Sequence, residues 1–459
     1  MFIGRKKELQ TLEDSHRSSH FQLVVLYGRH GVGKSSLLNE FISHKPYLYF
    51  TGIESNEIHN LNSFLKYIRL ASGDSNFASS ADSFESALEA IFQLSQNQKF
   101  ILVLDNFHLL SKAVKNLTTI LKSLITKYRN TSKLFLVLCG SGFSAMENLV
   151  LDPKSPLFQT ETHLMKLQPF DYFESCQFFK RFSSTETAYI YGMTGGVPAY
   201  LLHFNDKVTL DENVKNTFLN PLSPLYAEPG HLLAHEVREQ ALYTAILSIL
   251  SEHPCKMAEI HTQIQEETSV CTAYLKSMLS MGIVSKEAPV ADKSVKKTIY
   301  RICDPIFRFW YRFIPDQLTN ISCGRTDLAW GQIKPHLNQY MADVFKDISK
   351  QYLVNLHASG KAPFRFSTIG QWWGLEPKTN RKIAFDILAT DNHQSVLFGH
   401  CHWGDDLLDT PTIEQLMTDS ASFKQNNKFY YIFSKNGFTK PCREFVQKYN
   451  NITLISFSK

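Results

Sequence analysis

Apolar residues in the first third of the chain fall into two alternating patterns. Continuous apolar runs of strand length occupy residues 22–27, 100–104 and 134–139. Residues 34–44, in contrast, repeat their apolar positions at the spacing of a helix. Buried strands that alternate with such helices are typical of a parallel sheet with helices packed on it. The pattern therefore predicts an α/β domain over residues 1–168.

The middle of the chain is mainly helical in its periodicity. Helical spacing covers residues 170–182, 186–193, 234–250, 257–265 and 270–281. A connector is marked by Pro221, Pro224 and Pro229. We therefore expect a helical lid and connector over residues 169–233. Short apolar stretches at 282–284 and 298–302 follow the later helices, and three helices with two short strands predict a winged-helix domain over 234–315.

The last third mixes one long helical stretch with short apolar runs. The helix is expected at residues 339–353, and strands are expected at 365–368, 383–390, 395–401 and 429–434. Together these elements predict a small α/β domain over residues 316–459.

Composition narrows the class of protein. At 459 residues the chain exceeds one compact core, and its net charge of +5 allows only a local basic patch. No apolar run reaches membrane-spanning length and no export signal precedes the first charges, so we expect a cytoplasmic protein without a membrane partner. The eight cysteines contain no CxxC pair and are expected to be reduced core residues.

Residues 28–35, which read GRHGVGKS, match the phosphate-binding loop (P-loop) pattern between a strand and a helix. Glycines let backbone N–H groups surround phosphates, the lysine reaches the β- and γ-phosphates, and the serine hydroxyl binds Mg²⁺. The motif predicts binding of ATP or ADP with Mg²⁺. The expected nucleotide-binding residues of the motif and its helix are Gly28, Arg29, His30, Gly31, Val32, Gly33, Lys34, Ser35 and Ser36.

Two later strands end in polar residues that fit the same site. Asp105 follows the run at 100–104 as a Walker B aspartate, which would hold Mg²⁺ together with Ser35. Ser141 follows the run at 134–139, where a sensor residue would contact the γ-phosphate or the attacking water. The alternative for Ser141 is a simple turn at the end of a strand.

These motifs resemble the archaeal-type ATPase family, a branch of the AAA+/STAND P-loop proteins. The resemblance includes FIGR at the start of the chain, LYGRHGVGKSSLL, LVLDNFHLL, LCGSGFSAME and YGMTGGVP. It implies that the opening segment lies against the adenine, through Phe2, Ile3, Gly4 and Arg5. It also implies that the segment ending in Pro198 begins a helical lid that senses the nucleotide.

Two departures from the family pattern bear on catalysis. Asn106 stands where the family has the glutamate that activates water, and a neutral amide cannot accept the proton. We therefore expect slow hydrolysis, with Asn106 at the catalytic position; His108 is a less favoured alternative base. Gln159 and Thr160 stand where the family often has a Gly-Arg pair, so this chain lacks the arginine of that pair.

The predicted winged helix leaves DNA binding open. Its basic residues are Lys276 on the candidate recognition helix and Lys293, Lys296, Lys297 and Arg301 in the wing. These basic residues are few for a surface that contacts nucleic-acid phosphates. The alternative is a module that docks an unknown protein partner or a neighbouring domain.

The C-terminal third resembles the domain of unknown function 234, which belongs to the PD-(D/E)xK nuclease-like superfamily. Asp386 remains, but Lys346, His400 and His402 replace a helix glutamate and the Glu-x-Lys pair. Because Mg²⁺ prefers several oxygen ligands, the resemblance implies a retained fold with a degenerate site. In an alternative, the two histidines share one face of a strand and bind zinc with Asp386.

The leading hypothesis is an ATP-dependent molecular switch that regulates through its C-terminal domains. The rivals are an ATP-gated nuclease or metal-dependent hydrolase and a winged-helix DNA-binding regulator. The sequence does not indicate the oligomeric state.

Overall fold

The computed structural model describes residues 2–74, 77–78, 80–141, 143–158, 160, 163–237, 239–290, 297–376 and 380–458. The chain forms two compact units. The first comprises Met1–Phe170 and Val197–Ala199, and the second comprises Asp171–Gly196 and Tyr200–Lys459. The predicted lid, the predicted winged-helix region and the last domain thus belong to one unit. The division into four domains remains a prediction.

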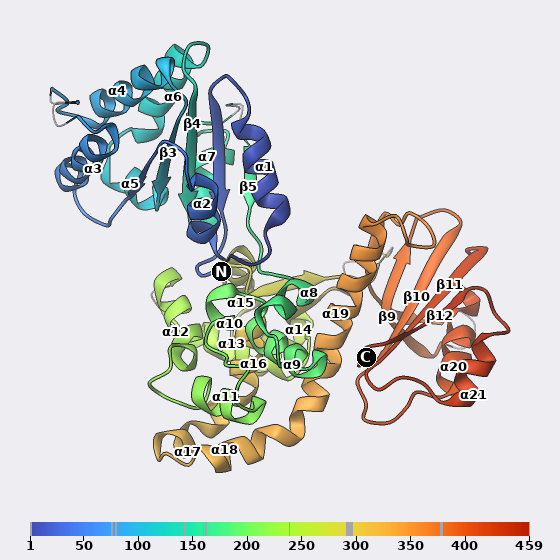
Figure 1. Ribbon diagram of the computed structural model, residues 1–459. Coiled ribbons are helices and arrows are strands. Elements are labelled where there is room, and N and C mark those ends of the chain that lie inside the picture. The colour runs from blue at the N-terminus through green and yellow to red at the C-terminus, as the bar shows by residue number, and fades with distance from the viewer. Residues whose placement is uncertain are drawn as a thin grey trace. The chain divides into compact units, whose positions relative to one another are not determined.

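A five-stranded parallel sheet forms the centre of the first unit, as the sequence predicts (Figure 1). Its strands are β1 Gln22–Tyr27, β2 Tyr47–Thr51, β3 Phe100–Asp105, β4 Leu134–Gly140 and β5 His163–Lys166, in the order β2-β3-β4-β1-β5. Since β4 lies between β1 and β3, the carboxyl ends of all three strands meet at one edge. This edge carries the P-loop and the end of the Walker B strand.

Helices cover both faces of this sheet (Figure 1). They are α1 Lys6–His16, α2 Lys34–Ile42, α3 Glu57–Ser72, α4 Phe84–Asn97, α5 Phe107–Ala113, α6 Leu117–Tyr128 and α7 Phe143–Leu151. Alternate residues of β1 point to opposite faces: Val24 and Leu26 pack with α1 and α2, and Leu23 and Val25 pack with the other helices. Burying each such side chain contributes roughly 1.5–3 kcal/mol.

The lid region differs from its predicted elements. Its helices are α8 Tyr172–Ser175, α9 Ser184–Thr194, α10 Pro198–Leu201, α11 Leu210–Thr217 and α12 Pro224–Glu236, with a 3₁₀ turn η1 at Cys176–Phe178. The predicted helix at 170–182 therefore ends early. The predicted connector is wrong after residue 223, because Pro224 occupies the first turn of α12, where its missing N–H is tolerated. The helix predicted at 234–250 is confirmed only from Ala241 onward, since Val237 is extended and ends α12.

The three helices and two strands expected for a winged helix are present. They are α13 Ala241–Glu252, α14 Met257–Ile264, α15 Thr268–Ser280, β6 Val284–Glu287 and β7 Ile299–Ile302. The two strands pair antiparallel. Helix α16, Pro305–Phe313, follows and buries four aromatic side chains.

The last domain is a mixed sheet that follows a long helix. Its helices are α17 Leu318–Ser322, α18 Thr326–Ile333, α19 Leu337–Ala358, α20 Thr410–Asp419 and α21 Lys440–Val446, with 3₁₀ turns at Pro315–Gln317 (η3), Lys334–His336 (η4) and Ser420–Ser422 (η5). Its strands are β8 Thr368–Leu375, β9 Lys382–Thr390, β10 Ser395–His402, β11 Asn427–Ser434 and β12 Ile452–Ser456. Strands β8, β9 and β10 are antiparallel neighbours, and β10, β11 and β12 are parallel. The strand predicted at 365–368 is wrong, because pairing with β9 begins at Ser367 and Thr368.

Lid and last domain share one hydrophobic core. Tyr172, Ala188 and Tyr191 from the lid pack with apolar residues of α19 and of the last sheet. Two buried arginines add to this: Asp347 of α19 accepts hydrogen bonds from Arg301 of β7 and Arg308 of α16. The C-terminal domain is therefore built onto the lid and the hairpin of the same unit.

Two expectations about composition can be compared with the structure. None of the described helices is long and apolar enough to cross a membrane. All eight cysteines are free thiols, and five of them are buried. Cys303 and Cys323 are exposed, so the expectation of core positions is wrong for these two.

Candidate nucleotide-binding site

The loop after β1 has the geometry of a phosphate-binding loop. Gly33 adopts φ +92°, a left-handed conformation that other residues rarely adopt, and it precedes α2. A Cβ at Gly28 would lie 2.4 Å from the backbone oxygen of Leu167, so only glycine fits where the loop leaves the sheet. The N-cap residue of α2 is Gly33, which has no side chain to cap the first turn. Free N–H groups at a helix N-terminus are the arrangement that binds phosphate.

Lys34 lies inside this loop and is 8% exposed. Its Nζ donates hydrogen bonds to the backbone oxygens of Gly28 and Arg29, each at 2.8 Å. Burial lowers the pKa of Lys34 from its ordinary value. A phosphate would offer charged acceptors in place of these two carbonyl oxygens, which makes the lysine a suitable phosphate ligand.

Asp105 is held by a side chain from β2 and by the backbone that follows it. Tyr49 Oη donates to Asp105 Oδ2 at 2.6 Å, and the backbone N–H of Asn106 donates to Oδ1 at 2.8 Å. Ser35 also lies near the Tyr49 hydroxyl, so this phenol neighbours both residues expected to hold Mg²⁺. Burial, and after it the hydrogen bond to Asp105, raises the pKa of Tyr49 and keeps it protonated. Burial and the nearby Asp105 likewise raise the pKa of the Cys139 thiol.

Sequence reasoning missed Tyr49. In strand β2 the hydroxyl-bearing residues Tyr47, Tyr49 and Thr51 alternate with buried Leu48 and Phe50, whereas β1, β3 and β4 are buried along nearly their whole length. The alternation itself, YLYFT, was the available signal for a strand.

The candidate catalytic positions lie next to this aspartate. Asn106 begins α5 with φ 50° and ψ 39°, a left-handed conformation that asparagine tolerates better than glutamate. His108 lies on the first turn of α5, and its buried Nδ1 has no hydrogen-bond partner among the described residues. Burial, followed by the charges of Lys112 and Lys34, lowers the pKa of His108, so its ring is neutral at pH 7. Ser141 directly follows β4 and is partly exposed.

The opening segment is fastened to the P-loop by Arg5. This residue is 4% exposed, and its guanidinium donates to the backbone oxygens of Val32 at 2.9 Å and Gln168 at 2.6 Å. It also stacks over Phe170, with Cζ 4.2 Å from the ring centroid. Arg5 therefore positions backbone around the site. Phe2, Ile3 and Gly4 are partly buried beside it, and their contact with adenine remains a prediction.

The segment around Pro198 lies directly on the P-loop. The backbone N–H of Ala199 donates to the oxygen of Gly31 at 3.1 Å. A Cβ added to Gly31 would lie 2.9 Å from Cβ of Ala199 and 3.2 Å from Cγ1 of Val197. The structure thus brings a sequence-distant segment, predicted as the start of the lid, onto the phosphate loop.

These residues fit a nucleotide with its magnesium ion. The loop supplies backbone donors and a buried ammonium group, and Ser35 with Asp105 supplies oxygen ligands of the kind that Mg²⁺ prefers. Bound Mg²⁺ would neutralise phosphate charge, while the chain's own groups orient the nucleotide. Fold and site together define an ATP-binding P-loop ATPase with a strand inserted between its two motif-bearing strands.

Comparisons with known proteins agree with this class. Residues 2–204 match the family of ATPase domains found predominantly in Archaea, and residues 310–418 match a family of archaeal and bacterial proteins of unknown function, domain 234. The chain therefore carries an archaeal-type ATPase domain joined to a domain of unknown function 234.

Two proteins are similar to this chain in sequence, and one solved structure is similar to it in fold. An uncharacterized protein of Methanocaldococcus jannaschii, MJECL04, is 29% identical over 411 residues, with 88% of each chain covered. An uncharacterized ATP-binding protein of the same organism, MJ0423, is 42% identical over 45 residues, 10% of this chain and 76% of the relative. Among solved structures, the Walker-type ATPase PABY2304 of Pyrococcus abyssi is similar in fold, with TM-score 0.53 and 20% identity, covering 68% of this chain and 96% of that one.

The second group of predicted site residues lies in the last domain. Lys346 Nζ is 3.3 Å from Asp386 Oδ1 and 3.1 Å from Asp343 Oδ1. His400 Nδ1 is 3.2 Å from Asp386 Oδ2. Burial alone would raise the pKa of Asp386, but the hydrogen bond to His400 and the charge of Lys346 lower this pKa below its ordinary value. Asp386 is thus an ion-pair partner of a lysine.

The zinc alternative does not find its three ligands together. His402 Nε2 is 3.2 Å from Asp406 Oδ1 instead. Among the residues that the structure describes, His400, His402 and Asp386 do not form a set within metal-ligand reach of one another. Sequence alternation placed both histidines on one face of β10, but it gave no information about the Asp406 loop that follows.

The basic residues of the predicted wing are also accounted for in part. Arg301 is buried and paired with Asp347, so it is not available to phosphates on the surface. Lys276 on α15 is exposed. Lys293, Lys296 and Gln159 lie outside the described residues.

Proposed function

We propose that this ATPase works as a slow, nucleotide-dependent switch that transmits the state of its P-loop to the C-terminal unit. The observation that carries the proposal is the path of the chain near Pro198. Residues Val197–Ala199 group with the ATPase unit and bond to Gly31, whereas the residues on both sides belong to the second unit. A change in loop conformation on nucleotide binding therefore acts on a peptide continuous with α9 and α10.

Slow turnover is the second part of the proposal. Asn106 occupies the position after the Walker B aspartate, and its amide cannot take a proton from water. A switch that persists in its ATP state for long periods suits regulation of a protein partner.

Hydrogen–deuterium exchange tests the switch. With an ATP analogue bound, we expect protection of the peptide covering residues 195–204 to differ severalfold from its protection with ADP, because the Ala199 N–H bonds the loop. The peptide of β12, Ile452–Ser456, serves as an internal reference. Identical exchange in both states, with nucleotide occupancy verified, would contradict the proposal. Lys34→Ala should abolish the difference.

The rival nuclease function is disfavoured by the ammonium group of Lys346 beside Asp386. A magnesium site needs that space and charge for the metal. We expect no cleavage of single- or double-stranded DNA with Mg²⁺ or Mn²⁺. Cleavage by the purified chain that disappears in Asp386→Ala, with Asp391→Ala as the control for an unrelated aspartate, would show that the nuclease site works.

A further inference from the structure

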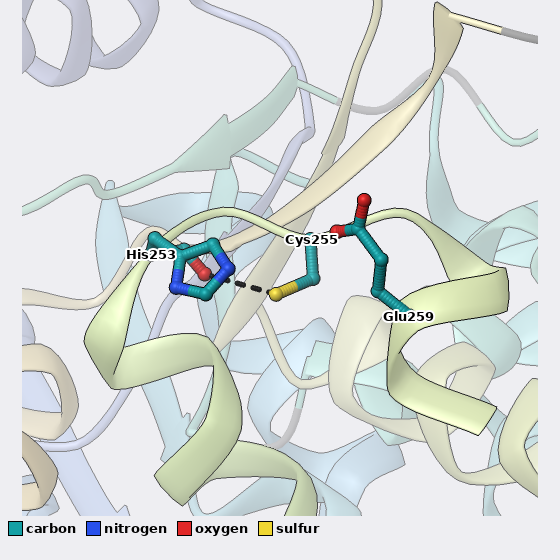
Figure 2. Close-up of side chains that lie close together, drawn as sticks. All are labelled: His253, Cys255 and Glu259. Atoms are coloured by element: carbon teal, nitrogen blue, oxygen red, sulfur yellow. Dashed lines mark hydrogen bonds between the residues drawn. The ribbon is translucent and has the colours of Figure 1, made fainter. Parts of the chain in front are cut away.

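Three side chains of different metal-binding types meet at the loop between α13 and α14 (Figure 2). His253 follows α13, Cys255 lies in the loop, and Glu259 lies in the first turn of α14. One ligand atom of each, an imidazole nitrogen, the thiol sulfur and a carboxylate oxygen, lies within 4.8 Å of the others. This group lies in the winged-helix region and is separate from the nucleotide site and from the Asp386 cluster.

The backbone fixes the sulfur in place. Two backbone hydrogen bonds join Cys255 to Tyr300 of β7. The Cys255 N–H donates to the Tyr300 oxygen at 3.0 Å, and the Tyr300 N–H donates to the Cys255 oxygen at 2.7 Å. The loop is thereby attached to the two-stranded hairpin. Cys255 itself is buried, whereas His253 and Glu259 are exposed and surround it from the solvent side.

The carboxylate is also oriented. Glu259 Oε2 accepts a hydrogen bond from the backbone N–H of Lys256 at 3.1 Å. This bond holds the side chain over the start of α14 and leaves the other carboxylate oxygen free to coordinate. His253 needs only a rotation of an exposed ring to bring a nitrogen closer.

A nitrogen, a sulfur and an oxygen ligand together match a borderline-soft divalent ion, and zinc accepts this combination with water as a fourth ligand. With bond lengths of about 2.0–2.3 Å, ligand atoms in a tetrahedral site lie roughly 3.5 Å apart. Here the three ligand atoms lie within 4.8 Å of one another, about 1 Å farther apart than in such a site. Rotation of the two exposed side chains, His253 and Glu259, would close this difference. The Cys255 thiol now donates a hydrogen bond to the His253 backbone oxygen, with Sγ 3.2 Å from that oxygen. Metal binding must displace the thiol proton.

We propose that His253, Cys255 and Glu259 bind one zinc ion or a similar thiophilic divalent cation. The bound ion would cross-link the end of α13, the loop attached to β7 and the start of α14. It would therefore stiffen the contact between the helices and the hairpin of this region. The proposed site is independent of the proposed switch.

Cobalt(II) titration of the full-length chain tests the site, because a cobalt–thiolate bond gives a near-ultraviolet charge-transfer band. We expect one cobalt per chain with this band, displaced by one equivalent of zinc. Cys255→Ser should remove the band. His253→Ala should weaken zinc binding about 100-fold, since losing even an outer-shell partner of a metal site costs about 10–100-fold.

Matched variants separate ligand loss from misfolding. Cys323→Ser removes an exposed thiol elsewhere and should keep the band. Glu259→Gln retains a side-chain oxygen that accepts the hydrogen bond from the Lys256 N–H, so the local fold is kept. Its zinc affinity should fall, because the carboxylate charge is lost. A band that survives in Cys255→Ser, or the absence of cobalt and zinc binding at micromolar concentrations in wild type, would overturn the proposal. Unchanged thermal unfolding of each variant, measured without metal, confirms that the second unit, which contains these residues, is folded.

Discussion

Asn106→Glu is expected to raise the steady-state rate of ATP hydrolysis by about 10²–10⁴-fold, the typical contribution of a general base. The substitution places a carboxylate directly after Asp105, where Asn106 now begins α5. The left-handed backbone at this position, with φ 50°, makes glutamate less favourable than asparagine by roughly 1–2 kcal/mol. We therefore expect a faster but somewhat less stable enzyme, measured by phosphate release and by thermal unfolding.

The matched control for this gain is Asn106→Gln. It carries the same length and the same backbone strain as the glutamate variant but no base, so its turnover should stay at the wild-type level. His108→Ala tests the other candidate base. If wild type already turns over several times per second and loses that rate in His108→Ala, then the neutral, unpartnered His108 ring supplies the base and the role given to Asn106 is wrong.

Lys34→Ala is expected to weaken binding of ATP by about 100-fold or more. Each charge-assisted hydrogen bond is worth about 1.5–3 kcal/mol, and a lysine that reaches two phosphates loses two of them. In addition, the backbone oxygens of Gly28 and Arg29 lose the ammonium group that now lies between them. Isothermal titration with ATP and with ADP measures the loss.

Lys45→Ala is a suitable control for that experiment. Lys45 lies in the same unit, is partly buried and pairs with Glu13 at 2.7 Å, but it is not in the P-loop. Its removal should leave nucleotide affinity within a factor of two or so, since a surface ion pair contributes about 0–1 kcal/mol to stability. Equal affinity in wild type and Lys34→Ala would remove the basis for assigning the P-loop.

Continuous apolar strands and the glycine-rich turn were the most predictable parts of the molecule. The bounds of β1 follow directly from its apolar run, because a central parallel strand is buried on both faces. Strand β2 lies at the edge of the sheet and is half exposed, so a search for strands buried on both faces does not find it. Tyr49 was missed for the same reason. Arg5 was placed near the nucleotide by resemblance, but its bond to Gln168 depends on a distant segment that local patterns do not report.

The C-terminal site shows the same limit. The replacement of carboxylates by Lys346, His400 and His402 could be read from the sequence, and the ion pair between Lys346 and Asp386 follows from it. The pairing of His402 with Asp406 depends on a turn after β10. The His253, Cys255 and Glu259 group was missed because its residues are a mixed set with no familiar spacing, brought together by the loop that Tyr300 holds.

The core that the lid shares with the last sheet limits how this gene can be rearranged by recombination. Tyr172, Ala188 and Tyr191 are encoded before residue 197, whereas Met341 and Phe345, against which they pack, are encoded far downstream. An exchange of the C-terminal part between related genes would combine the lid of one protein with the C-terminal sheet of the other. Such a hybrid leaves apolar side chains of α9 without their partners, which favours aggregation and degradation. Productive exchanges must therefore transfer residues 171–196 together with the C-terminal domain.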